Sequence, residues 1–203
     1  MKPAWVAAMA AAMGSSAEVS GAAHLPEMVA ARVQGGGLGS DPVTLLRVEG
    51  FGPSVVYRMQ MLRDLFGGHV EALDVEPSRE LWREVRDVVP FADGTDRPVW
   101  RVSMPPSAGW RMVAALRMQA AVDAFYDWQG GLVWLRMEAE PEAELVRGLV
   151  ATLGGGHATL VRAAPSVRAA VPVFEPQPPG LAALSGRLKA EFDPKGILNP
   201  GRM

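Results

Sequence analysis

The stretch from residue 97 to residue 163 limits the possible folds more than any other part of this chain. Extended and amphipathic segments alternate there in the order strand, helix, strand, strand, helix, strand. The strands are predicted at residues 97–105, 121–128, 132–138 and 157–163, and the helices at 107–117 and 140–153. This order is that of the ferredoxin-like split βαβ unit.

The sequence before this stretch suggests a partial second copy of the same unit. Residues 43–50 predict a strand, residues 53–66 a helix, residues 69–76 another strand, and residues 79–89 a helix with Ser78 as its cap. We therefore expect an α+β fold. Ferredoxin-like units would share a largely antiparallel sheet with helices on one face, followed by a C-terminal helix and an extended tail.

Three regions are expected along the chain. Residues 1–16 are Ala-rich and predict an N-terminal helix, or alternatively a leader. Residues 17–175 form the main domain and end in a Pro-rich extended connector. Residues 176–203 contain the last helix, with Leu181, Leu184 and Leu188 as its expected buried stripe, and then the tail.

The composition excludes several kinds of chemistry. The chain has no Cys, which removes disulfides, thiolate metal sites and Cys nucleophiles. Its net charge of −2 and lack of a basic stripe argue against a nucleic-acid partner. The three His residues show no metal-ligand spacing, and no Ser-His-Asp relay can be assembled, so we predict neither a metal site nor a catalytic residue. No apolar run approaches the ~20 residues that span a bilayer.

The aromatic hairpin at residues 121–138 is the best candidate for a binding site. Tyr126 and Trp128 share one strand face, with Asp127 on the other, and Arg101 lies in the preceding strand of the same sheet. A guanidinium beside aromatic rings suits a small carboxylate, which Arg can hold with two hydrogen bonds. His157, at the rim after three glycines, completes the predicted substrate site. The alternatives are an aromatic core and an Asp127–Arg pair that only joins the strands.

The C-terminal sequence LKAEFDPKGILNPGRM, residues 188–203, resembles the C-terminal signature of FAD-linked oxidases of the vanillyl-alcohol oxidase type. Further stretches, including WRVSMPPSAG, YDWQGGLVWL and GGHATLVRA, resemble the cap domain of the bacterial glycolate oxidase E-subunit family. The resemblance extends from about residue 19 to the end of the chain.

This resemblance implies an oxidoreductase that uses FAD to oxidise a small 2-hydroxy acid such as glycolate or lactate. It implies that residues 17–175 are the substrate, or cap, domain. The expected partners are an FAD-binding half or subunit, the glycolate oxidase D subunit and the iron–sulfur F subunit. The expected location is cytoplasmic, or peripheral at the inner membrane through the complex. The alternative is a non-catalytic assembly module of such a complex.

The resemblance also gives the tail a role. It implies that residues 176–203 dock on a flavin-binding domain, with Asn199, Gly201 and Arg202 near the cofactor. The flavin-binding half is not recognisable in this sequence. We therefore expect the isolated chain to lack FAD and activity, and its tail beyond Asp193 to be mobile.

Overall fold

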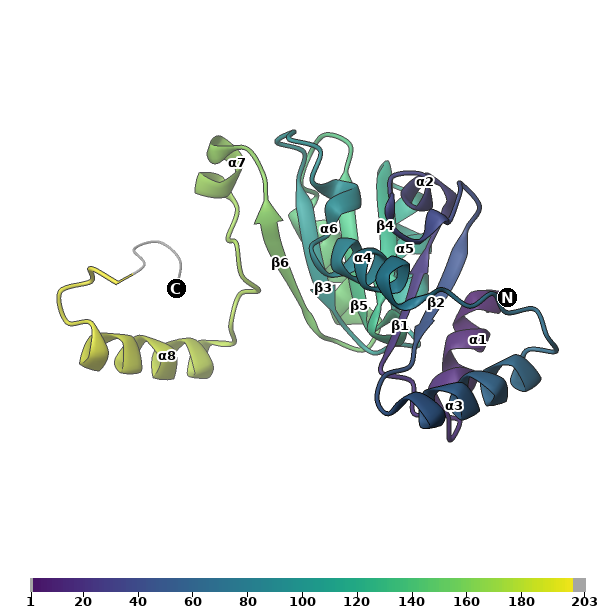
Figure 1. Ribbon diagram of the computed structural model, residues 1–203. Coiled ribbons are helices and arrows are strands. Elements are labelled where there is room, and N and C mark those ends of the chain that lie inside the picture. Colours follow the sequence, from purple (N-terminus) through teal and green to yellow (C-terminus); the bar gives the residue numbers. More distant parts are fainter. Residues whose placement is uncertain (1, 199–203) are drawn as a thin grey trace.

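A single antiparallel sheet organises the computed structural model, which describes residues 2–198 (Figure 1). Within those residues the sheet has six strands in the order β2-β1-β4-β5-β3-β6, and each neighbouring pair is antiparallel. Their bounds are β1 Gly21–Leu25, β2 Val43–Arg47, β3 Val99–Ser103, β4 Val122–Asp127, β5 Leu132–Met137 and β6 His157–Arg162. The predicted α+β class is confirmed.

The ferredoxin-like unit is present as predicted. Its elements follow the order β3, α5 (Gly109–Arg117), β4, β5, α6 (Ala143–Thr152) and β6, and the strands lie in the order β4-β5-β3-β6. Both helices cover one face of the sheet. The core beneath them is apolar and includes Trp100, Val102, Met112, Leu116, Leu135, Val146 and Leu160, all 0% exposed. Trp100 also satisfies its indole N–H, which donates to the Pro141 carbonyl at 2.8 Å.

The N-terminal part extends this sheet with a two-stranded edge. β1 pairs with β2 along its length and meets β4 where His24 lies opposite Tyr126. The helix α1 (Ala4–Met13) is formed as predicted, and it packs over β1 and β2 on the face that α5 and α6 cover. α3 (Gly52–Leu65) lies against α1 and buries Leu62 with Ala12.

The predicted strand at residues 69–76 is wrong, and with it the second ferredoxin-like copy. Residues 69–74 are irregular, and α4 (Val75–Arg86) begins directly after them. Pro77 explains the difference, because it lacks the N–H that a strand ladder uses but is tolerated in the first turn of a helix. Leu81 and Val85, one turn apart on α4, are both 1% exposed.

α4 covers the face of the sheet opposite α5 and α6. There Leu81 and Val85 pack with Phe91 and Phe125, beside the short helix α2 (Glu27–Ala30). The 3-10 turns η1 (Gly35–Gly37) and η2 (Val89–Phe91) join this layer. The expected single helical face therefore describes α5 and α6 only. On the opposite face, α4 and the segments beside it bury residues of β1 and β4 and Val99 at the start of β3. Further along, Arg101 of β3 is only half-buried, and His157 and Val161 of β6 are exposed.

One finer prediction needs correction. Ser78 lies within α4, and Asp74 occupies the position before that helix, so Ser78 does not cap it. On α6 the buried residues are Val146 and Val150, and Leu145, Leu149 and Leu153 are partly buried beside them.

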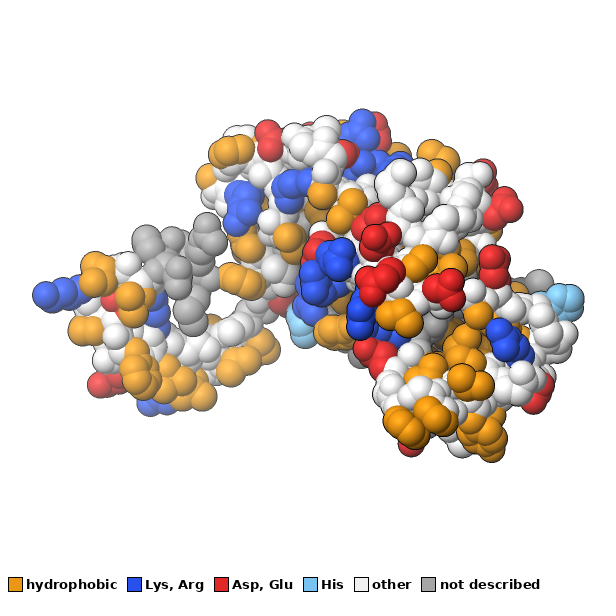
Figure 2. Space-filling view, in the orientation of Figure 1, with side chains coloured by type: hydrophobic (Ala, Val, Ile, Leu, Met, Phe, Trp, Pro, Cys, Tyr) orange, Lys and Arg blue, Asp and Glu red, His pale blue; other side chains and the backbone are white. Residues whose placement is uncertain are grey.

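The C-terminal part leaves the sheet. The connector after β6 includes a short helix, α7 (Pro165–Ala170), where only an extended segment was expected. α8 (Pro179–Phe192) then stands away from the domain (Figure 1). Leu181, Leu184 and Leu188 are 50%, 44% and 53% exposed, so the predicted buried stripe faces outward, as the hydrophobic side chains on this helix show in Figure 2. Only Leu181, at the start of α8, borders the sheet, in a pocket with His157 and Thr159 of β6.

Asp193 holds the first part of the tail against the end of α8. Its carboxylate accepts bonds from the backbone N–H groups of Ile197 and Leu198, both at 2.9 Å, and from the Lys189 ammonium at 2.7 Å. The Lys189 bond is the main cause that lowers the pKa of Asp193. These bonds give residues 197 and 198 a local anchor on α8, and the expected mobility beyond Asp193 stays a prediction.

Candidate functional site

The uncovered part of the sheet carries the candidate site. Along β3, Trp100 and Val102 face α5 and α6, whereas Arg101 points to the opposite side because successive strand residues alternate. Arg101 lies opposite Trp134 of β5 and opposite Thr159 of β6. The sheet thus places one guanidinium among aromatic and hydroxyl side chains on an open face.

The tight turn between β4 and β5 brings Trp128 to Arg101. The strand ends at Asp127, whose carboxylate accepts a 2.7 Å bond from the Trp128 backbone N–H. Trp128 and Gln129 then take positive φ angles of 49° and 61°. Such angles cost non-glycine residues about 1–3 kcal/mol each, and they cluster where proteins position functional groups. As a result the indole leaves the strand plane, and the Arg101 guanidinium lies 5.4 Å from its ring centre.

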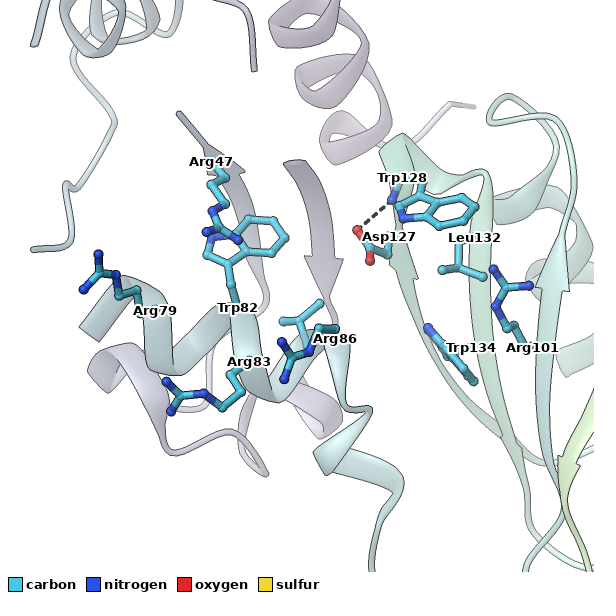
Figure 3. Close-up of a pocket in the computed structure, with 11 residues that line it drawn as sticks. Arg47, Arg79, Trp82, Arg83, Arg86, Arg101, Asp127, Trp128, Leu132 and Trp134 are labelled. Carbon is cyan, nitrogen blue, oxygen red and sulfur yellow. Dashed lines mark hydrogen bonds between the residues drawn. The ribbon is translucent and has the colours of Figure 1, made fainter. Parts of the chain in front are cut away.

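A cleft of about 480 Å³ extends from Arg101 across the sheet to α4 (Figure 3). One wall comes from β3, β4 and β5 and the turn between β4 and β5, and the other from α4 and the end of β2. Its lining side chains are mostly cationic or aromatic, namely Arg47, Arg79, Trp82, Arg83, Val85, Arg86, Arg101, Asp127, Trp128, Leu132 and Trp134. Five arginines and one carboxylate line the cleft, and Glu49, Glu76 and Asp87 pair with three of the arginines. The remaining excess of positive charge favours anions.

Asp127 is the carboxylate of this cleft. Burial raises its pKa, and the hydrogen bond from the Trp128 N–H opposes that shift. The expected alternative, an Asp127–Arg pair that joins the strands, is not formed among the described residues. Asp127 instead holds the turn that presents Trp128.

Tyr126 does not belong to this site. It is 4% exposed and packs on the α1 and α5 side of the sheet, with its ring 4.3 Å from Trp5. Burial raises its pKa to about 12. The predicted shared face of Tyr126 and Trp128 is wrong because the strand ends at Asp127, so the alternation does not continue to Trp128.

His157 shares the open face with Arg101 but lies one strand further out. It is opposite Ser103, the second residue after Arg101 on the same side of β3. It borders a separate pocket of about 330 Å³ with Thr159, Phe174 and Glu175. The structure therefore brings Arg101 and Trp128 together and places His157 beside them on the sheet rather than in their cleft.

Two glycines of the Gly-rich stretches pack closely against backbone. Gly35 approaches the backbone of α4 at Leu81, and a Cβ on Gly156 would collide with the carbonyl oxygen of Ser103. Both glycine-rich stretches thus serve turns and close packing. Among residues 2–198, no three His, Asp or Glu side chains gather closely enough to hold a metal ion. Asn199, Gly201 and Arg202, the predicted flavin neighbours, lie outside the described residues.

The sequence analysis missed the α4 side of the cleft. Arg79, Arg83 and Arg86 are spaced four and three residues apart, which places them along one side of a helix. That spacing was visible in the sequence, but only the fold shows that α4 lies opposite Arg101. None of the helices in the described part of the chain is long and apolar enough to cross a membrane.

Comparison with known proteins supports the resemblance seen in the sequence motifs. The chain is 31% identical over 166 residues to glycolate oxidase subunit GlcE of Escherichia coli (strain K12). The match covers 80% of this chain and 39% of that protein, so the chain spans less than half the length of its relative. No family model matches the chain. The resemblance to a glycolate oxidase E-type subunit is thereby confirmed.

Proposed function

We propose that this chain is the C-terminal, substrate-covering part of an FAD-linked oxidoreductase subunit of the glycolate oxidase type. The observation that carries this proposal is the similarity to GlcE over 80% of the chain, together with the half-buried Arg101 beside Trp128 in the cleft. The substrate class is a small 2-hydroxy acid. FAD would supply the oxidising chemistry when bound, held by a flavin-binding half or subunit.

In this proposal Arg101 anchors the carboxylate of the substrate. A planar guanidinium offers two parallel N–H donors, which fit the two carboxylate oxygens. The neighbouring Trp128 ring restricts the guanidinium to one side, and Leu132 and Trp134 exclude water from the bound acid. A charged hydrogen bond in a partly desolvated site is stronger than in water.

The proposed division of the chain into two parts rests on the same similarity to GlcE. Residues 17–175 form the cap domain, and residues 176–203 dock on the flavin-binding half, with Asn199, Gly201 and Arg202 near the cofactor. The exposed stripe of α8 supports this docking, because half-exposed leucines gain free energy on burial. The glycolate oxidase D and iron–sulfur F subunits are the proposed further partners.

Arg101→Lys tests the substrate role. In the enzyme assembled from this chain and a flavin-binding partner, we expect kcat/KM for glycolate to fall about tenfold or more, because a point charge replaces the planar fork. The FAD content should stay unchanged. The control is Arg111→Lys, an exposed residue on α5 on the other side of the sheet. Unchanged kinetics in Arg101→Lys would contradict the proposal.

A second candidate is a non-catalytic assembly module, which the exposed leucines of α8 favour. In that case Leu184→Asp with Leu188→Asp would abolish association with the flavin-binding partner, whereas Arg101→Lys would alter neither association nor turnover. Size-exclusion chromatography and steady-state kinetics on both variants separate the two candidates.

A further inference from the structure

The turn that presents Trp128 is fixed by the segment between β3 and α5. The Met104 N–H donates to the Gly131 carbonyl at 2.9 Å, and the Gly131 N–H donates to the Trp128 carbonyl at 3.0 Å. These two bonds connect the end of β3, the strand that carries Arg101, to the turn that carries Trp128. The two side chains are therefore linked through the backbone as well as through the contact between ring and guanidinium.

Gly109, the first residue of α5, packs directly against this turn. A Cβ on Gly109 would collide with the carbonyl oxygen of Gly130 and would lie 2.9 Å from a methyl group of Val133. Only glycine therefore admits the Gly130 carbonyl at its present position. Gly130 itself takes a φ angle of 92°, in the left-handed region that favours glycine. The position of the turn thus depends on the absence of a side chain at residue 109.

Trp128 in turn orients Arg101. The Arg101 side chain is half-buried, and it forms no ion pair within residues 2–198. Its guanidinium lies 5.4 Å from the centre of the Trp128 ring, a distance at which a cation is attracted to an aromatic face. A displaced turn would move the ring and change the direction in which Arg101 presents its N–H groups.

We propose that Gly109 and Asp127 are positioning residues for Arg101, which they affect through the turn and Trp128. Gly109 does not line the cleft, so its effect passes through the backbone of the turn. Asp127 holds the start of the same turn, because its carboxylate accepts the Trp128 N–H at 2.7 Å. This inference rests on the proposed function, since it concerns the same site.

Nuclear magnetic resonance of the chain tests the inference without any ligand. The probe is the Nε–H signal of Arg101, identified by its loss in Arg101→Lys. We expect Gly109→Ala to shift this signal by more than its line width, because the ring current of a displaced indole changes the chemical shift of nearby protons. Gly148→Ala, at an exposed position of α6 where a Cβ meets nothing within 4 Å, is the matched control and should leave the signal in place.

Two variants of Asp127 decide the test if Gly109→Ala does not fold. Asparagine keeps a side-chain oxygen that can accept the Trp128 N–H, whereas alanine does not, and both remove the same charge. We expect Asp127→Ala to shift the Arg101 signal more than Asp127→Asn does. The difference between these two variants reports the hydrogen bond and not the lost carboxylate charge.

Three results would overturn the inference. They are an unmoved Arg101 signal in folded Gly109→Ala, equal shifts in the two Asp127 variants, and a Gly109→Ala shift that persists when Trp128 is already replaced by leucine. The last result would show that the effect does not pass through the indole.

Kinetics separate this inference from the proposed function. In the enzyme assembled with a flavin-binding partner, we expect Gly109→Ala to lower kcat/KM for glycolate about fivefold, chiefly through KM, because a displaced Arg101 binds the carboxylate less well. A shifted Arg101 signal with unchanged kinetics would leave the positioning role standing, and it would count against Arg101 as the carboxylate anchor.

Discussion

His24 shows how packing changes the chemistry of a single residue. Its ring stacks on Trp5 with centroids 4.4 Å apart, and its Nδ1 lies 3.1 Å from the Thr44 hydroxyl. The side chain is buried, and burial lowers the pKa of His24 from 6.5 to about 4. The imidazole is therefore neutral in the folded protein at pH 7, and it serves the core rather than a binding site.

This shift predicts a loss of stability in mild acid. Between pH 6.5 and pH 4 the unfolded chain binds a proton at His24 that the folded chain does not, so the free energy of unfolding falls as the pH falls. The contribution is up to about 3 kcal/mol. Urea denaturation of His24→Gln should show a flatter dependence over this range, whereas His69→Gln, at an exposed position, should follow the parent. Parallel curves for His24→Gln and the parent would refute the assignment.

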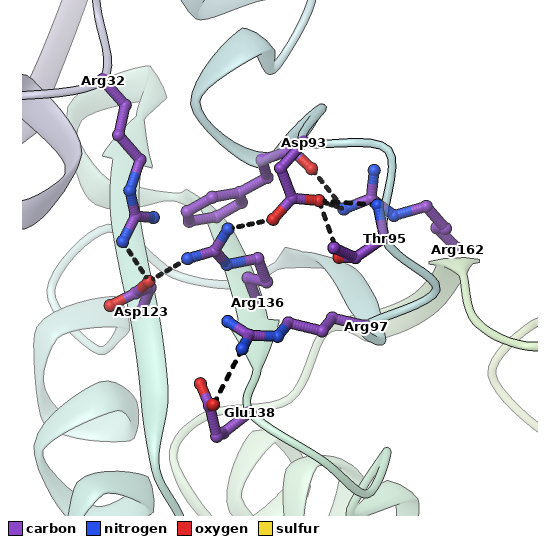
Figure 4. A network of polar contacts seen from close by, with 9 residues as sticks. Arg32, Asp93, Thr95, Arg97, Asp123, Arg136, Glu138 and Arg162 are labelled. Carbon is purple, nitrogen blue, oxygen red and sulfur yellow. Dashed lines mark hydrogen bonds and ion pairs between the residues drawn. The ribbon is translucent and has the colours of Figure 1, made fainter.

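At the scale of elements, a charged network fastens the segment after α4 to the sheet (Figure 4). Arg136 of β5 is 7% exposed, bonds Asp123 at 2.6 Å and also pairs with Asp93. Arg32 pairs with Asp123 from the other side at 2.8 Å, and Arg162 reaches Asp93 at 3.4 Å. The Arg136 guanidinium also lies 5.4 Å from the Phe91 ring, which keeps η2 over the sheet.

Arg136→Met is expected to destabilise the protein by about 3 kcal/mol. Methionine keeps the packing on Phe91 but leaves two partly buried carboxylates without their shared cation. The matched control is Arg97→Met, whose pair with Glu138 is exposed and should contribute less than about 1 kcal/mol. Urea denaturation at pH 7 measures both variants. A cost for Arg136→Met as small as that of Arg97→Met would show that the network is not stabilising.

The whole molecule consists of a packed domain and a helix that stands apart. The connector between β6 and α8 is anchored to the domain. Arg147 donates to the carbonyls of Pro172 and Phe174, and the Leu160 N–H donates to the Val173 carbonyl at 2.8 Å. Beyond this connector, α8 buries none of its residues. Its helical hydrogen bonds are therefore supported by local interactions alone.

Amide hydrogen exchange should show this division. We expect α8 to exchange much faster than α5, because α5 buries Met112 and Leu116 in the core and can open only when the domain does. Adding a flavin-binding partner should slow exchange in α8 and leave α5 unchanged. Protection of α8 equal to that of α5 in the isolated chain would contradict the structure described above.

The sequence determined the local features of this protein by itself. Periodicity located β3, α5, β4, β5, α6 and β6, because each is long enough and regular enough for its pattern to dominate. The glycines of the turn between β4 and β5 marked the hairpin. The motifs of the tail and cap stretches also pointed to the relative that the comparison found.

The contacts that those elements make with one another were decided only by the tertiary structure. Pro77 and the burial of Leu81 and Val85 turned a predicted strand into α4, and the position of α4 made it the second wall of the cleft beside Arg101. The left-handed turn at Trp128 separated its ring from Tyr126, since backbone conformation at a turn outweighs strand alternation. The leucines of α8 have the spacing of a buried stripe, yet they remain exposed. Periodicity shows which face of a helix is apolar, but only the tertiary structure shows whether another surface covers that face.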